Sequence, residues 1–314
     1  MALVLMKNWC EQKVVEVCGV KIGGYLGENP TLLVGSIFYL GDKLLLSKEG
    51  DIDRGAAAQV INEAESLTRD LGLSFGLDVV FPTEESVSKI MPFVAEYDVP
   101  LFLDSPSPEA RIKAYFMAKE LGIEGKSVAN GIYTNTSEKE LEAIRESKIR
   151  AAVLLAFDPA NPATSLRAES RLKILKENLI PLAWKAGVTN VIADAVVLDP
   201  ASIAVSAEAI YMFKEKLGVP SGCAPANALG PASRKVLGTD AAYGVHGGAA
   251  VLLRLHGADF IMYGPVKRVK YVAHAVAMAD SLLGYSARLH GAAIGRNHPL
   301  RKFLRNIQKL FASS

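Results

Sequence analysis

The feature that most constrains the fold of this chain is an alternation of eight short apolar runs with longer amphipathic segments. The runs lie at residues 32–38, 75–80, 101–103, 127–132, 151–157, 190–193, 220–224 and 258–263. They are apolar on both faces, as expected for parallel strands that are covered outside by helices and packed inside. Eight consecutive strand–helix units with short connections favour a closed (β/α)8 TIM barrel over an open doubly wound sheet.

The segments between the runs carry apolar residues at helical spacing. Residues 57–71 and 87–94 each present one apolar stripe, which is typical of helices that cover a sheet. Ser107 is placed to cap a helix whose first position is Pro108. Val266, Val272 and Leu283 lie on one stripe and predict a single long helix after the last strand.

Length and composition predict one domain. α/β barrels reach 314 residues as single domains, and no linker or low-complexity tract divides the chain, so we expect one barrel over residues 1–314. Residues 11–24 predict a hairpin, with Val14 and Val15 in one arm, that plugs the barrel bottom. Residues 299–311 predict a basic amphipathic helix, which either packs on the barrel or a dimer mate or docks on a membrane surface or partner subunit.

Charge, cysteine content and the amino-terminal segment exclude several classes of protein. A net charge of +2, with no basic cluster, argues against nucleic acid as a partner. Cys10, Cys18 and Cys223 form no CxxC pair, which indicates a reducing compartment and a cytoplasmic location. The opening residues 1–9 lack a cleavage site for secretion, and no stretch reaches the ~20 apolar residues of a membrane span.

Five polar side chains stand at or just beyond the predicted carboxyl ends of strands. They are Asp78, Asp104, Asn130, Asp194 and Asn227. In a TIM barrel these ends form the active face. Each residue alone is explained by a helix cap or a turn, but together they predict a site for a flat heterocycle with donors and acceptors, such as a pterin.

Two further features bear on cofactors. The cysteines and the five histidines lack metal-ligand spacing, so we expect no metal site. The glycine-rich run at residues 243–249 is expected to open a helix after the seventh strand. There it either packs tightly against a neighbouring helix or cradles a phosphate at the helix N-terminus.

Longer motifs, taken in order, resemble those of one family. They are Gly19-Val-Lys-Ile-Gly-Gly, Gly35-Ser-Ile-Phe-Tyr, Phe102-Leu-Asp-Ser-Pro-Ser-Pro-Glu-Ala-Arg111 and Ala151-Ala-Val-Leu-Leu-Ala-Phe-Asp-Pro. Over residues 11–295 the chain is similar to the H subunit of tetrahydromethanopterin S-methyltransferase and its soluble relatives. Those relatives include methyltransferases that pass a methyl group between tetrahydrofolate and corrinoid proteins.

The resemblance implies a pterin-binding barrel of the dihydropteroate synthase type. By position, Asp104, Asn130 and Asp194 are expected to hold the pterin ring, and Asn227 to approach its N5. Asp78 lies one strand earlier at the same rim and is expected to assist them. The expected catalytic residues are therefore Asn227 and Asp194.

The implied function is methyl transfer in one-carbon metabolism or methanogenesis. The N5-methyl group of a methyltetrahydropterin, either tetrahydromethanopterin or tetrahydrofolate, moves to or from the cobalt of a corrinoid (cobalamin) supplied by a partner protein, and relatives suggest a homodimer. One alternative is a non-catalytic barrel subunit that docks onto a membrane methyltransferase complex, and another is dihydropteroate synthesis. The buried carboxylates favour catalysis, because a scaffold does not need them.

Overall fold

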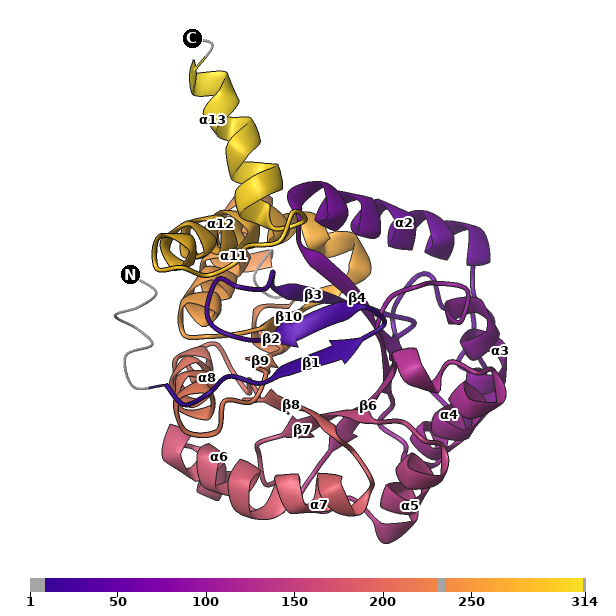
Figure 1. Cartoon of the computed structure of the whole chain (residues 1–314). Helices are drawn as coiled ribbons and strands as arrows, with labels where there is room; N and C mark the ends of the chain where they lie inside the picture. Colours follow the sequence, from indigo (N-terminus) through magenta and orange to yellow (C-terminus); the bar gives the residue numbers. More distant parts are fainter. Residues whose placement is uncertain (1–8, 231–234, 313–314) are drawn as a thin grey trace.

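The computed structural model describes residues 9–230 and 235–312, and a closed barrel of eight parallel strands forms its core (Figure 1). The last strand, β10, pairs with the first barrel strand, β3, and so closes the ring. The strands are β3 Leu32–Ile37, β4 Ser74–Val80, β5 Leu101–Asp104, β6 Ser127–Ile132, β7 Ala151–Leu155, β8 Asn190–Asp194, β9 Ser221–Cys223 and β10 Phe260–Pro265. All eight fall on the predicted runs, so the predicted barrel is confirmed.

Helices surround the barrel and bury their apolar stripes against it (Figure 1). They are α2 Arg54–Leu71, α3 Glu84–Val94, α4 Pro108–Glu120, α5 Glu138–Glu146, α6 Ala168–Ile174, α7 Ile180–Lys185, α8 Ser202–Leu217, α9 Ala226–Leu229, α11 Thr239–Leu255 and α12 Ala273–Leu289. As predicted, the Ser107 side chain caps α4 by accepting a hydrogen bond from the Ala110 N–H, and Pro108 is the first residue of the helix.

Two details of the predicted helices are wrong. The single helix expected over residues 266–283 is a 3-10 helix, Val266–Tyr271, followed by α12, and the break falls at Val272. Its apolar spacing of three residues suits both helix types, which explains the error. The glycine-rich run does not open a helix, because α11 begins at Thr239. A Cβ on Gly247 would lie 3.1 Å from that of Ala275, so this glycine allows α11 to pack closely on α12.

A two-stranded hairpin closes the amino-terminal end of the barrel (Figure 1). It consists of β1 Val14–Val17 and β2 Val20–Gly23, within the predicted range. Its buried residues Val17 and Ile22 belong to the same apolar cluster as Phe102 and Val128 from inside the barrel. The hairpin therefore seals one end, and the carboxyl ends of the strands form the other.

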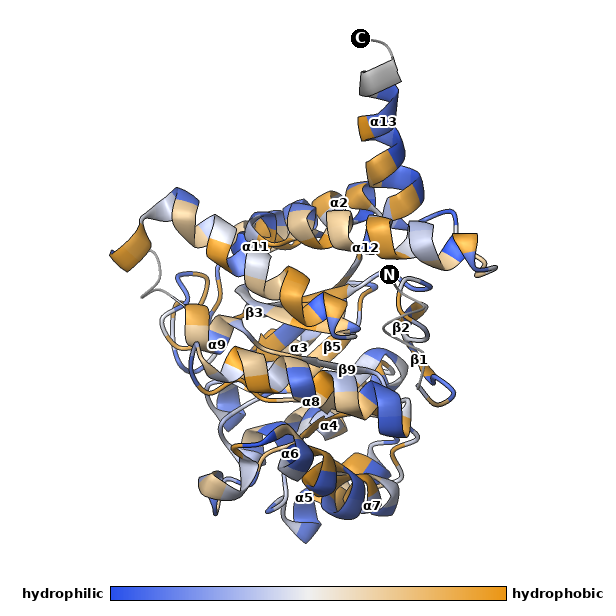
Figure 2. Ribbon diagram, turned by 90° about the vertical axis from the view of Figure 1, so that its left-hand side faces the viewer, coloured by the Kyte–Doolittle hydropathy of each residue, from blue (hydrophilic) through white to orange (hydrophobic). Residues whose placement is uncertain are grey.

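The carboxyl-terminal segment leaves the body of the molecule. A π-helical turn, Leu300–Leu304, leads into α13 Arg305–Ala312, which projects away from the barrel (Figures 1 and 2). The side chains of Leu310 and Phe311, part of the predicted amphipathic stripe, lie outside what the structure describes, as do the opening residues 1–8. No helix in the described part of the chain is long and apolar enough to cross a bilayer.

Candidate functional site

The carboxyl ends of the barrel strands enclose a cavity of about 180 Å³ that all five predicted site residues line. The complete lining consists of Asp78, Asp104, Asn130, Asp194, Asn227, Ser36, Tyr133, Leu155, Ala224, Ala226, Met262 and Gly264. The structure therefore brings together residues that are up to 149 positions apart in the sequence (227 − 78 = 149). Their assignment to a pterin ring stays a prediction.

Strand register explains why these side chains meet. Asp78 pairs in register with Ser36 of β3, and Asp104 pairs with Asn130 of β6. Asp194 ends β8, and Asn227 lies in the short helix α9 that follows β9. Because parallel strands end at the same rim of a barrel, polar residues at these positions converge on its mouth.

Asp78 is satisfied within the cavity wall. Its Oδ2 accepts a hydrogen bond from Ser36 Oγ at 2.7 Å, and its Oδ1 accepts one from Asn130 Nδ2 at 3.1 Å. Burial raises the pKa of Asp78 to about 6, against the two hydrogen bonds, which lower it. Asp78 thereby fixes the orientation of the Asn130 amide group, whose oxygen stays available to the cavity.

Asp104 has the most perturbed carboxyl group of the cavity. Within residues 9–230 and 235–312, its carboxyl has no side-chain hydrogen-bond partner. Burial, and then the negative charge of Asp78, raises its pKa to about 8, although Arg111 and the Ser105 N–H lower it. The Asp104 carboxyl group therefore favours its protonated form at neutral pH.

Asp194 is held by the turn that follows its strand. Its Oδ1 accepts a hydrogen bond from the Val196 N–H at 2.6 Å. Burial raises the pKa of Asp194 to about 7, against the Val196 N–H and the charge of Arg171. Val196 has a φ of 56°, which is unfavourable for a β-branched residue, so the surrounding contacts must impose this turn.

Arg171 from α6 imposes the turn at Val196. Its Nη1 donates to the Val196 carbonyl at 2.8 Å, to the Ala195 carbonyl and to Ser206 Oγ at 3.1 Å. The Ser206 hydroxyl also donates to the Val196 carbonyl, at 2.9 Å. Arg171 thus aims the Val196 N–H at the carboxylate and also places a positive charge behind it.

A second buried arginine supports the loop after β5. Arg111 makes two hydrogen bonds to Glu140, of 2.6 and 3.0 Å, and a third to the Ser105 carbonyl at 2.5 Å. Its guanidinium lies 5.9 Å from the ring centre of Tyr133, which lines the cavity. Arg111 and Arg171 therefore hold the cavity wall from behind without lining it.

The sequence analysis missed Ser36, Tyr133 and the two supporting arginines. Ser36 and Arg111 both lie within motifs quoted above, but nothing local marks them as neighbours of a carboxylate. Among the described residues, no group of three or more His, Cys, Asp or Glu side chains is arranged to hold a metal ion. The chemistry of the cavity is therefore that of carboxyl, amide, hydroxyl and phenol groups.

Comparison with protein families and curated proteins gives one consistent result. The family model described as the tetrahydromethanopterin S-methyltransferase MtrH subunit matches residues 10–294. The chain is 32% identical to this subunit of the Methanococcus aeolicus enzyme, covering 94% of this chain and 98% of that protein. It is 30% identical to the same subunit from Methanothermobacter thermautotrophicus, again covering 94% of this chain and 98% of that protein.

Solved structures resemble the chain in fold. Dihydropteroate synthase from Yersinia pestis with a pterine-sulfa conjugate superposes with a TM-score of 0.60 at 14% identity, covering 88% of this chain and all (100%) of that one. The Thermus thermophilus enzyme in complex with 6HMPPP gives a TM-score of 0.57 at 17% identity, covering 86% of this chain and 99% of that one. At these identities the likeness establishes the type of barrel alone.

Proposed function

The chain belongs to the family of the tetrahydromethanopterin S-methyltransferase MtrH subunit, and from this membership we propose that its mouth cavity binds a methylated tetrahydropterin and transfers the N5-methyl group. The methyl group passes to or from the cobalt of a corrinoid held by a partner protein. One observation carries the proposal: the carboxyl groups of Asp78, Asp104 and Asp194 line one cavity, and no Lys or Arg side chain within residues 9–230 and 235–312 lines it.

The donor groups of a pterin complement this cavity. The aminopyrimidinone edge of the ring offers two parallel N–H donors, and one carboxylate can accept both hydrogen bonds. An Asn amide can both donate to and accept from ring edges that carry donors as well as acceptors. A volume of about 180 Å³ is below the ~300 Å³ typical of whole-ligand pockets, so it suits the ring rather than the whole carrier. The side arm of the carrier then extends over the rim.

Methyl transfer from N5 requires a proton. As the C–N5 bond breaks and the methyl group joins its acceptor, the N5 electron pair takes up one proton, and the reverse reaction returns it. Burial raises the pKa of Asp194 to about 7 and that of Asp104 to about 8, so both carboxyl groups can store this proton near neutral pH. Asn227 is proposed to approach N5 and to stabilise the positive charge that protonation gives this atom.

Exposed apolar side chains around the mouth support docking of a protein partner. Leu40, Leu166 and Leu198 are 68%, 60% and 45% exposed. They lie in the loops after β3, β7 and β8, hence on the rim of the cavity. A corrinoid is too large for the cavity itself, so its carrier protein must cover this rim for the cobalt to reach the methyl group.

A homodimer is supported by a second apolar surface on the barrel wall. The exposed residues Val245 and Leu252 of α11 and Met278, Leu282 and Tyr285 of α12 lie on two helices that pack side by side (Figure 2). An exposed apolar face of this kind marks an interaction site, and such a face can meet its own copy across a two-fold axis. Pairing through the wall leaves both mouths open.

The alternative of a non-catalytic docking subunit is less well supported. A scaffold has no need of the carboxyl groups of Asp104 and Asp194, because burial raises the pKa of each to neutrality or above and so costs stability. The described carboxyl-terminal helix α13 still projects with exposed Arg305 and Lys309, so an enzymatic subunit can also attach to further partners through it.

In the decisive experiment, purified protein is mixed with free cob(I)alamin, and the absorbance of the reduced cobalt is followed over time. Separate reactions contain methyltetrahydromethanopterin or 5-methyltetrahydrofolate, and loss of the reduced-cobalt band reports methyl transfer. We expect wild-type protein to consume the band with at least one carrier and Asp194→Asn, which cannot donate a carboxyl proton, to be slow. If wild-type protein binds neither carrier in a calorimeter, the proposed function is wrong.

A further inference from the structure

One buried cation of this barrel, Arg268, has no hydrogen-bond or ion-pair partner among the residues that the structure describes. The Arg268 side chain is only 7% exposed, and its Nε is buried without a hydrogen-bond partner. None of its other nitrogens forms a hydrogen bond or ion pair with any residue that the structure describes. A buried charge without a partner is costly, and proteins normally retain one only where something compensates for it.

The other deeply buried arginines behave differently. Arg111 pairs with Glu140, Arg254 pairs with Asp280, and Arg171 donates to three carbonyls and a hydroxyl. Each of them holds a loop or a helix in place through these contacts. Arg268 holds no such group, so structural support does not explain its burial.

Arg268 lies beside the mouth cavity. It belongs to the 3-10 helix that directly follows β10, where Gly264 lines the cavity, and β10 pairs with β3, where Ser36 lines the same wall. Just beyond β3 stands Tyr39, where burial raises the pKa of the hydroxyl and the charge of Arg268 acts in the opposite direction. Arg268 therefore lies just after the last barrel strand, and its charge acts on Tyr39, which stands just after the first barrel strand.

We propose that Arg268 binds the anionic end of the carrier's side arm. This inference rests on the proposed function and identifies the part of the substrate that lies outside the ring cavity. The arm of a folate carries a glutamate carboxylate and that of methanopterin a phosphate, and both accept paired hydrogen bonds from a guanidinium. Loops after the last strands of TIM barrels commonly form such anion sites.

The position of Arg268 fits the path of the arm. The ring fills the cavity, so the arm must leave over a stretch of rim, and the wall formed by Ser36 and Gly264 leads toward Arg268. The carboxylate of Asp78, and that of Asp194 when it is ionised, repels an anion, whereas the Arg268 charge attracts one. Carboxyl groups therefore bind the ring and a guanidinium binds the arm, and this difference fixes the orientation of the carrier in the site.

The test compares two pterins that differ only in the arm. Binding of 5-methyltetrahydrofolate and of 5,6-dimethyltetrahydropterin, which has no arm, is measured by calorimetry on wild type, Arg268→Gln and the control Lys267→Gln. Lys267 is the neighbouring exposed cation and loses the same charge. We expect Arg268→Gln to weaken the folate ~10-fold or more and to leave the armless pterin unchanged, while Lys267→Gln affects both little.

A stability measurement separates binding from a structural role. Because Arg268 has no hydrogen-bond or ion-pair partner among the described residues, we expect Arg268→Met to unfold at the wild-type temperature or above it. The inference would be overturned if the Arg268 variants unfolded at a lower temperature and bound both pterins equally weakly. It would also be overturned if the substitution left the affinity for the folate unchanged. If inorganic phosphate binds the wild type at this arginine without competing with the folate, the site serves a free anion instead. Failure of both pterins to bind wild type refutes the proposed function itself.

Discussion

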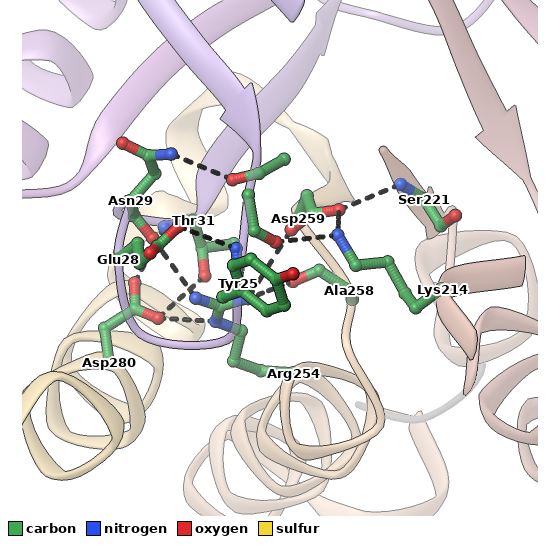
Figure 3. Close-up of polar contacts among 12 residues, drawn as sticks. Tyr25, Glu28, Asn29, Thr31, Lys214, Ser221, Arg254, Ala258, Asp259 and Asp280 are labelled. Carbon is green, nitrogen blue, oxygen red and sulfur yellow. Dashed lines mark hydrogen bonds and ion pairs between the residues drawn. The ribbon is translucent and has the colours of Figure 1, made fainter. Parts of the chain in front are cut away.

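The two ends of the barrel bury charged groups in opposite ways. At the amino-terminal end, a base cluster of Lys214, Arg254, Asp259 and Asp280 pairs each carboxylate with a cation (Figure 3). At the carboxyl-terminal end, the mouth cavity contains three carboxyl groups and, among the described residues, no lining cation. Ion pairs offset the cost of burying charge at the base, whereas at the mouth the charges of Arg111 and Arg171 offset it only in part.

The base cluster ties distant segments together. Arg254 Nε donates to Asp280 at 2.5 Å and its Nη1 to the Ala258 carbonyl at 2.9 Å, while Asp280 also accepts from the Thr31 N–H at 2.7 Å. Lys214 donates to Asp259 at 2.8 Å. Figure 3 shows these groups pointing toward one another from α8, α11, α12 and the starts of strands. Complete pairing of this kind identifies a structural cluster.

The mouth differs because its incompletely compensated carboxyl groups line a cavity. Burial raises the pKa of Asp104 to about 8 and that of Asp194 to about 7, although the charges of Arg111 and Arg171 lower them. No cation of the described residues forms an ion pair with either carboxyl group. A group that is unfavourable in the folded protein and lines a cavity indicates a ligand more reliably than a group that is well paired. The following substitutions test this difference between the ends.

The largest expected effect is a loss of stability when the base cluster is disrupted. Arg254→Met leaves the buried Asp280 without a cation and removes one of the two cations beside Asp259, so we expect the free energy of unfolding to fall by ~3–5 kcal/mol. Urea denaturation followed by circular dichroism measures the loss. A loss below ~1 kcal/mol would mean that the base cluster is not the structural counterpart described here.

At the mouth, Asn227→Ala should act on turnover. We expect a fall of ~10²-fold in turnover, because the contact with N5 strengthens as positive charge develops there, and little change in unfolding free energy. Stopped-flow absorbance of cob(I)alamin measures the rate at saturating carrier. Normal turnover would remove Asn227 from the chemistry, and a large loss of stability would make it a structural residue.

Asp194→Ala should act mainly on binding. Loss of its contact with the ring is expected to weaken the methylated pterin by ~1–3 kcal/mol. Isothermal calorimetry measures the affinity, and Asp199, which is exposed on the following loop, provides a matched Asp→Ala control. Equal affinities of the Asp194 variant and wild type would place the ring elsewhere.

The smallest expected effect is a pH dependence of stability. Because burial raises the pKa of Asp104 from 3.8 to about 8, the folded state binds more protons than the unfolded state between these values. Its contribution to stability is therefore lost as the pH rises through this window. Asp104→Asn should remove that dependence and stabilise the protein at pH ~8 by on the order of 1 kcal/mol, with no gain near pH ~4. A variant less stable than wild type at the higher pH contradicts the proposed state of Asp104.

Much of the site follows from local sequence patterns. Apolar runs with polar residues at their ends predicted the strands and the rim, because in a parallel barrel every strand ends at the same face. For this reason Asp78 and Asp194 could be assigned to one mouth without coordinates. The hairpin at residues 14–23 also lies within the predicted range of residues 11–24.

The pairing of side chains was decided only by the tertiary structure. Whether Asp78 is satisfied depends on the register of β3, β4 and β6, and whether Asp194 is held depends on an arginine from another helix. Arg171 and Arg268 look alike in the sequence, yet one has four partners and the other has none among the described residues. Local periodicity fixes which face of an element is buried, but charge compensation arises from contacts between distant segments, which only closure of the barrel creates.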